Sequence, residues 1–102
     1  MRLCLLLCVV AALAACATVA APSAEMAAAR AMFIRAEPLG WRYAPNELRA
    51  AQAKLQAAEL AMAREDWPQA RRLAEEAEVD AKYAWSLAEN ERSRVELAKY
   101  AQ

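Results

Sequence analysis

The chain has 102 residues, with 13 Lys and Arg side chains against 13 Asp and Glu, and it contains no histidine. This length allows at most one small domain. A balanced charge without a basic cluster argues against nucleic-acid binding. Since imidazole is absent and serines are few, nucleophile–base pairs and histidine metal sites lack their parts. We therefore expect no cofactor, no small-molecule substrate and no enzymatic activity.

The first fifteen residues have the pattern of a secretion signal. Arg2 is followed by an apolar run, and Ala14 and Ala15 provide the small side chains that a signal peptidase requires before its cleavage site. We therefore predict a signal peptide over residues 1–15. Leu13-Ala14-Ala15-Cys16 resembles the lipobox of bacterial lipoproteins. The resemblance implies that Cys16 carries a diacylglycerol, becomes the new amino terminus and is then acylated with a fatty acid such as palmitate.

A lipidated Cys16 predicts permanent attachment to a membrane, because each buried methylene contributes about 0.8 kcal/mol. Residues 16–23 then form the lipidated cysteine and a short tether. By resemblance, Ala17 after the lipidated residue implies the outer membrane, with the protein facing the periplasm. The alternative is an uncleaved membrane span over the uncharged residues 3–21. Its alanine-rich second half inserts weakly, which favours the signal peptide.

The rest of the chain, residues 24–102, is predicted to be a helical domain, since it has one glycine and no strand pattern. A first helix is expected over residues 23–37, with Ser23 as its N-cap and Pro38 as its stop. Residues 38–46 are then expected to form a loop.

Two longer helices are expected after this loop, over residues 45–64 and 67–100. Pro45 suits the first turn of a helix, and Asp66 followed by Gln69 fits a capping box. A turn between the two helices sets large residues of one opposite alanines of the other. The predicted pairs are Met62–Ala70, Ala58–Ala74, Leu55–Ala77, Ala51–Ala81 and Leu48–Ala84.

A second stripe on the last helix comprises Val79, Tyr83 and Leu87. We expect the first helix to cover it, which gives an all-α, three-helix bundle-like fold. Beyond Ala88 the sequence is polar nearly all round, with predicted pairs Glu91–Arg94 and Glu96–Lys99. This tail is expected either to project into solvent or to meet a partner.

The hairpin residues are similar to a known family. The resemblance is carried by Ala44-Pro45, Leu48, Ala51, Leu55, Ala58, Asp66-Trp67, Ala70, Leu73-Ala74, Ala77, Asp80-Ala81 and Ala84. They resemble the domain of unknown function 4398 family of small Gram-negative envelope lipoproteins, which implies an envelope role and no known activity. Where that family has glycine before the aspartate of the turn, this chain has Glu65, so we expect a more gradual turn.

Two groups of side chains are candidate sites. Glu76 and Asp80 share a flank of the last helix and fit a cation, although a solvated charged face is the favoured interpretation. Four aromatic residues are candidate partner contacts, because exposed aromatics are favoured as interface anchors. They are Trp41, Tyr43, Trp67 and Trp85. The alternative is that they fill the ends of a thin core, which is the favoured interpretation for Trp67 at the turn. Trp41 and Tyr43 could also rest at the lipid headgroups.

These observations predict a non-enzymatic protein-interaction or scaffold module, anchored in the outer membrane through Cys16. The expected partner is an envelope protein or a second copy of the chain. The alternative is a structural tether between membrane and cell wall, in which case peptidoglycan is the partner.

Overall fold

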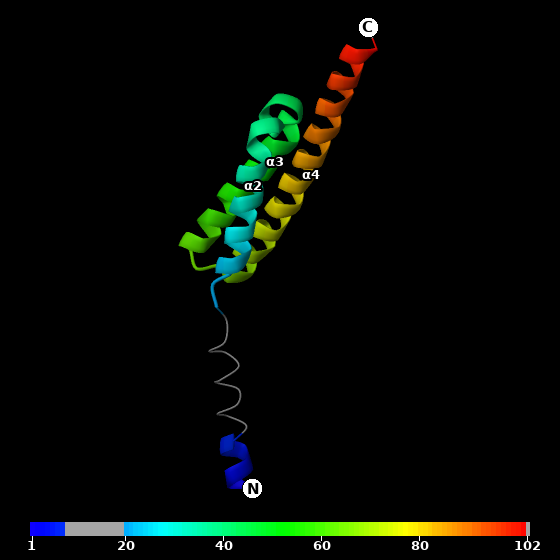
Figure 1. Ribbon diagram of the computed structural model, residues 1–102. Coiled ribbons are helices and arrows are strands. Elements are labelled where there is room, and N and C mark those ends of the chain that lie inside the picture. Colours follow the sequence, from blue (N-terminus) through cyan, green and yellow to red (C-terminus); the bar gives the residue numbers. More distant parts are fainter. Residues whose placement is uncertain (8–19, 102) are drawn as a thin grey trace.

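The computed structural model describes residues 1–7 and 20–101 (Figure 1). After a short helical stretch over residues 2–7, three helices follow: α2 (Ser23–Tyr43), α3 (Pro45–Ala63) and α4 (Trp67–Tyr100). These described residues contain no strand, so the all-α prediction is confirmed. The helices α2, α3 and α4 run side by side as a bundle (Figure 1).

The first helix is longer than the sequence predicts. It continues through Pro38 to Tyr43, so the expected loop over residues 38–46 is wrong. Pro38 faces solvent, while Ala36 and Gly40 on either side of it are buried, so packing keeps this part of the chain helical. The break falls at Ala44, whose φ is −144°, because the residue before a proline is pushed out of the helical region.

The start of α2 also differs from expectation. Ser23 is the first helical residue and not its cap, and Pro22 at the cap position offers no side-chain acceptor. The backbone carbonyl of Pro22 accepts from the Met26 N–H at 3.0 Å. Pro22 is itself buried, so packing fixes the entry of the chain into α2. Glu25 in the first turn complements the positive end of the helix dipole.

The turn between α3 and α4 is tight. Glu65 has a φ of 58°, in the left-handed region. Its N–H donates to the Met62 carbonyl at 3.0 Å, and the Asp66 N–H donates to the Ala61 carbonyl at 3.0 Å. These two bonds form a Schellman motif with glutamate in the position that glycine usually holds. The expected gradual turn is therefore wrong, because the two bonds satisfy carbonyls at the end of α3 and hold the strained residue in place.

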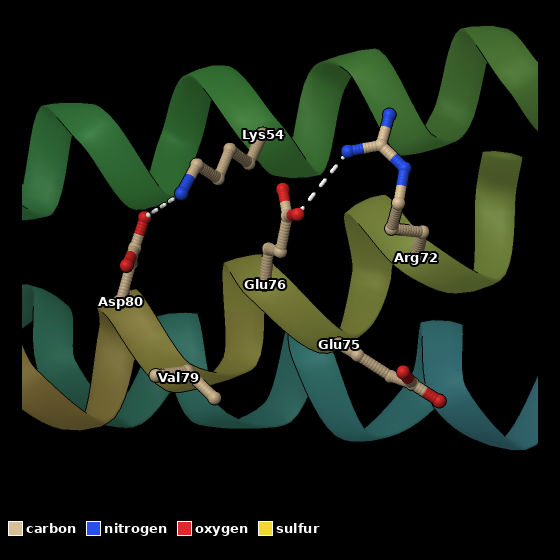
Figure 2. Close-up of a pocket in the computed structure, with 6 residues that line it drawn as sticks. All are labelled: Lys54, Arg72, Glu75, Glu76, Val79 and Asp80. Atoms are coloured by element: carbon tan, nitrogen blue, oxygen red, sulfur yellow. Dashed lines mark hydrogen bonds and ion pairs between the residues drawn. The ribbon is translucent and has the colours of Figure 1, made fainter.

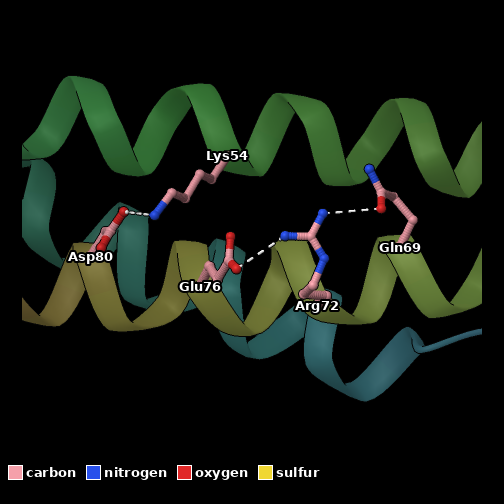
Figure 3. Close-up of polar contacts among 5 residues, drawn as sticks. All are labelled: Lys54, Gln69, Arg72, Glu76 and Asp80. Carbon is pink, nitrogen blue, oxygen red and sulfur yellow. Dashed lines mark hydrogen bonds and ion pairs between the residues drawn. The ribbon is translucent and has the colours of Figure 1, made fainter.

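Half of the predicted capping box is present. The Asp66 carboxylate accepts from the Gln69 N–H at 3.4 Å, which caps α4. The second bond of a capping box, from the Asp66 N–H to the side chain of Gln69, is missing because this N–H already donates to the carbonyl of Ala61. The side-chain carbonyl of Gln69 instead accepts from Arg72 at 3.0 Å (Figure 3).

The core lies along a stripe of alanines on α4. The six buried residues of this helix are Ala70, Ala74, Ala77, Ala81, Ala84 and Ala88. One cluster joins Leu55 and Ala58 of α3 to Ala74 and Ala77, and a second joins Leu48 and Ala51 to Ala81 and Ala84. Four of the five predicted pairs therefore share a cluster, and the pair Met62–Ala70 stays a prediction.

The chain's one glycine permits a close approach between α2 and α3. A Cβ added at Gly40 would lie 2.8 Å from a terminal carbon of Leu48. Leu48 is fully buried, so it has little room to move. This contact gives a glycine inside a helix a packing role that offsets its low helix propensity.

The position of α2 in the bundle differs from expectation. Val79 and Tyr83 are 63% and 60% exposed, so α2 does not cover their stripe. It packs instead on the alanine stripe, where Met26 and Ala29 join the same cluster as Ala77. Because alanine side chains are so small, one stripe of α4 can hold both α2 and α3.

The last turns of α4 extend beyond the ends of the other two helices (Figure 1). The predicted pair Glu91–Arg94 is present at 2.9 Å. Among the described ion pairs, none joins Glu96 to Lys99. Glu89, Glu91 and Arg92 are still partly buried, so α4 projects from the bundle after Arg92.

Two N-terminal predictions lie outside this description. Cys16 and the proposed cleavage site fall among residues that the structure does not describe. Within residues 1–7 and 20–101, no helix is both long and apolar enough to cross a membrane.

Candidate functional site

A shallow, open groove lies along α3 and α4 (Figure 2). Its volume is about 340 Å³. Five of its six lining residues carry charge, and the sixth is Val79; the charged ones are Lys54, Arg72, Glu75, Glu76 and Asp80. The groove contains both carboxylates of the proposed cation site.

A short ion pair joins the two helices in this groove. The Lys54 ammonium lies 2.7 Å from an Asp80 carboxylate oxygen (Figure 3). The hydrogen bond to Asp80 raises the pKa of Lys54, and the charges of Asp80 and Glu76 add to this effect. The Asp80 carboxylate is therefore already paired with a basic side chain from the neighbouring helix.

Glu76 is paired in the same way, but within α4. Its carboxylate accepts from the Arg72 guanidinium at 3.1 Å, and Arg72 also donates to Gln69 (Figure 3). In the described part of the chain, no three acidic or cysteine side chains gather in a way that could hold a metal ion. Glu76 and Asp80 thus stabilise the hairpin surface through lysine and arginine, which is the solvated charged face favoured by the sequence.

The candidate contact residues Trp41 and Tyr43 lie in the last turn of α2, not on a loop. Trp41 is 39% exposed, and its indole N–H donates to the Glu37 carboxylate at 3.4 Å. Tyr43 is half-buried, and the Arg42 guanidinium lies 5.2 Å from the centre of its ring. Both residues are therefore held in fixed positions at one end of the bundle.

Trp67 and Trp85 are both half-buried on α4. Trp67 is the first residue of α4, at the α3–α4 turn. Trp85 packs against the cluster that contains Ala81 and Ala84, and the Arg35 guanidinium lies 4.7 Å from the centre of the Trp85 ring. This cation–π contact links α2 to α4. Trp85 therefore belongs largely to the packing of the bundle.

The four aromatic residues do not form one surface. Trp67 lies at the end of the bundle where α2 begins, as the 3.8 Å pair between Glu25 and Arg71 also indicates. Trp41 and Tyr43 lie at the opposite end, in the last turn of the 21-residue α2. The length of α2 therefore separates Trp41 and Tyr43 from the start of the helical domain, and the interpretation that they rest at the lipid headgroups stays a prediction.

Sequence reasoning missed two basic residues of these contacts, Lys54 and Arg35. The Arg72–Glu76 pair has a visible signal, since four residues separate its members on one helix. Lys54 and Arg35 meet partners on another helix. The spacing of residues along one helix cannot predict contacts between different helices.

Comparison with known proteins assigns the family. The family described as "Domain of unknown function (DUF4398)" matches residues 24–100. No curated protein and no solved structure matches the chain. The match spans α2, α3 and α4, the alanine stripe and the Asp66 turn. The chain therefore belongs to the DUF4398 family.

Proposed function

We propose that this protein is a lipoprotein of the outer membrane that presents its helical bundle to the periplasm as a non-enzymatic interaction module. The observation that carries the proposal is the Leu-Ala-Ala-Cys sequence at residues 13–16, directly before a helical domain. Cys16 would hold the lipid, and the match to a domain of unknown function adds no activity.

The arrangement of the bundle supports an anchored module. The helical domain begins at Ser23, seven positions after Cys16, so seven extended residues would span at most about 25 Å. The α3–α4 turn lies at this same end, while the last turns of α4 project at the other (Figure 1). An anchor at Cys16 would therefore hold one end close to the membrane and present the far end to partners.

The surface at the far end supports protein contact. Trp41 near the end of α2 is 39% exposed, and the end of α4 exposes Leu97 and Tyr100. Apolar side chains that remain exposed on a small domain are favoured points of association. In the charged groove, the Lys54–Asp80 pair joins α3 to α4, and the Arg72–Glu76 pair lies within α4.

The anchor is tested by replacing Cys16. Cells that express the unchanged chain or Cys16→Ala are fed an alkyne analogue of palmitate, and the membrane fraction is analysed for label. We expect the label on the unchanged chain only, together with its loss from the outer membrane in the variant. Labelled Cys16→Ala, or an unlabelled native chain, would contradict lipidation.

The partner is tested by crosslinking in intact cells followed by affinity capture. Trp41→Ala tests the far end, and Trp67→Ala is its matched control at the anchor end. We expect an envelope protein to be captured with the native chain and less of it with Trp41→Ala. Co-sedimentation of the purified chain with peptidoglycan, without such capture, would overturn the interaction module in favour of a structural tether.

A further inference from the structure

The last turns of α4, residues 89–100, are here named the α4 overhang; Glu89, Glu91 and Arg92 at its base are partly buried, and the residues from Ser93 onward are exposed. The alanine stripe continues into it at the same alternation of three and four residues, through Ala84, Ala88, Glu91, Val95 and Ala98. Ala84 and Ala88 are fully buried beneath α2 and α3, whereas Val95 is 41% exposed. The overhang thus continues an established packing surface, which is exposed from Ser93 onward.

The overhang carries three acidic and three basic residues, in the order Glu89, Glu91, Arg92, Arg94, Glu96 and Lys99. An antiparallel copy centred on Val95 would set Glu91 opposite Lys99 and Arg94 opposite Glu96. A parallel copy would set every charge beside its own kind.

We propose that the α4 overhang pairs with the overhang of a second copy in antiparallel orientation, with Val95 at the two-fold axis. Such a contact is isologous, so each favourable pair occurs twice. The overhang's present ion pairs, Glu89–Arg92 and Glu91–Arg94, join residues of one helix at partly exposed positions. Pairs of this kind contribute little to stability and can be exchanged for contacts with the second copy.

The proposed contact is small. Two helical segments of about three turns each bury less area than a standard stable interface, so the pairing belongs to the weak class. A covalent trap is therefore the appropriate measurement. At the two-fold axis two Val95 positions face each other across closely packed helices, which suits the Cα separation that a disulfide requires.

The first experiment compares Val95→Cys with Leu97→Cys in oxidised membranes from cells that express the full chain. Leu97 is also on the overhang and is 68% exposed, but it lies on the opposite side of the helix. The unchanged chain gives the background from its three native cysteines. We expect a disulfide-linked dimer from Val95→Cys above both controls. Equal crosslinking at Leu97→Cys, no dimer, or an adduct with a different protein would overturn the proposal.

The second experiment tests the orientation by charge exchange in the Val95→Cys background. Glu91→Lys should lower the crosslinked fraction by about fivefold, because two opposite-charge pairs become like-charge pairs. Glu91→Lys with Lys99→Glu should restore it. A parallel pair would respond little to Glu91→Lys, so an unchanged fraction would overturn the antiparallel arrangement. These readouts do not depend on an envelope partner. An antiparallel pair directs the two Cys16 ends away from each other, so two anchored copies would lie along the membrane, and a crosslinked dimer would contradict the upright orientation of the bundle but not lipidation.

Discussion

Single residues determine how the chain passes from one helix to the next. At the α3–α4 turn, Glu65 adopts a φ of 58° that costs a non-glycine residue about 1–2 kcal/mol. Two backbone hydrogen bonds and the Asp66 cap hold this conformation. The turn is therefore formed by its neighbours and not by the preference of the residue at its centre.

We predict that Glu65→Gly stabilises the protein. The relief of the left-handed conformation exceeds the added chain entropy, for a net gain of up to about 1 kcal/mol, which corresponds to a rise in Tm of several degrees. The measurement is thermal unfolding of the full chain in detergent micelles, followed by circular dichroism. Arg64→Gly is the control, because Arg64 has an ordinary φ of −87° and should lose stability. A lower Tm for Glu65→Gly would contradict the strained turn.

The Lys54–Asp80 pair predicts a dependence of stability on alkaline pH. The pKa of Lys54 is raised in the folded protein, chiefly by its hydrogen bond to Asp80. Its contribution is therefore fully present below the unfolded pKa of about 10.4 and is lost as pH rises through the folded value. Because the lysine is substantially exposed, we expect the contribution to be below about 1 kcal/mol.

The test compares urea unfolding at neutral and alkaline pH. Lys54→Gln should lose less stability than the unchanged chain as pH rises, because it lacks the titrating pair. Lys99→Gln, on the α4 overhang, controls for the general effect of removing a lysine. An identical loss in Lys54→Gln and the unchanged chain would show that the pair contributes nothing.

At the scale of the helices, the alanine stripe of α4 determines the packing. Ala81 and Ala84 are fully buried in a cluster that contains residues of both α2 and α3. A larger side chain here would push against two helices at once. The small size of these residues is therefore a requirement of the three-helix arrangement and not only a feature of composition.

We predict that Ala81→Leu destabilises the protein by about 1–3 kcal/mol, because it overpacks a filled site. Ala53→Leu is the matched control, since Ala53 is exposed on α3 and accommodates the same change in solvent. Both are measured by urea unfolding of the full chain in detergent micelles. Equal midpoints for the two variants would show that α4 packs less closely than the structure indicates.

At the scale of the whole molecule, the bundle has two distinct ends. One end holds the start of α2 and the α3–α4 turn, and the other holds the α2–α3 connection and the α4 overhang (Figure 1). The 21 residues of α2 separate them by about 30 Å. If the lipid is attached at Cys16, the tryptophans should lie at different heights above the membrane.

This arrangement predicts an order of fluorescence quenching. Three variants each retain one tryptophan, with the other two replaced by phenylalanine, and they are reconstituted in vesicles that contain brominated lipid. We expect Trp67 to be quenched most and Trp41 least, since Trp67 lies at the anchor end. Stronger quenching of Trp41 would contradict the proposed orientation of the bundle.

The sequence by itself determined the helical class and the hairpin. The bounds of α3 and α4 lie within one residue of those predicted, and the alignment of Leu55 with Ala77 is confirmed by their common cluster. These features follow from local causes, namely proline at the first turn, an aspartate cap and a regular spacing of apolar residues. Each can be evaluated from a few neighbouring residues.

Only the tertiary structure decided the course and position of α2. A proline inside a helix costs about 3 kcal/mol, so local reasoning ends the helix before Pro38. In the folded chain, burial of Ala36 and Gly40 against residues far along the sequence offsets this cost. The same dependence explains why α2 packs on the alanine stripe and not over Val79 and Tyr83. Energies that arise between distant segments exist only once those segments have come together.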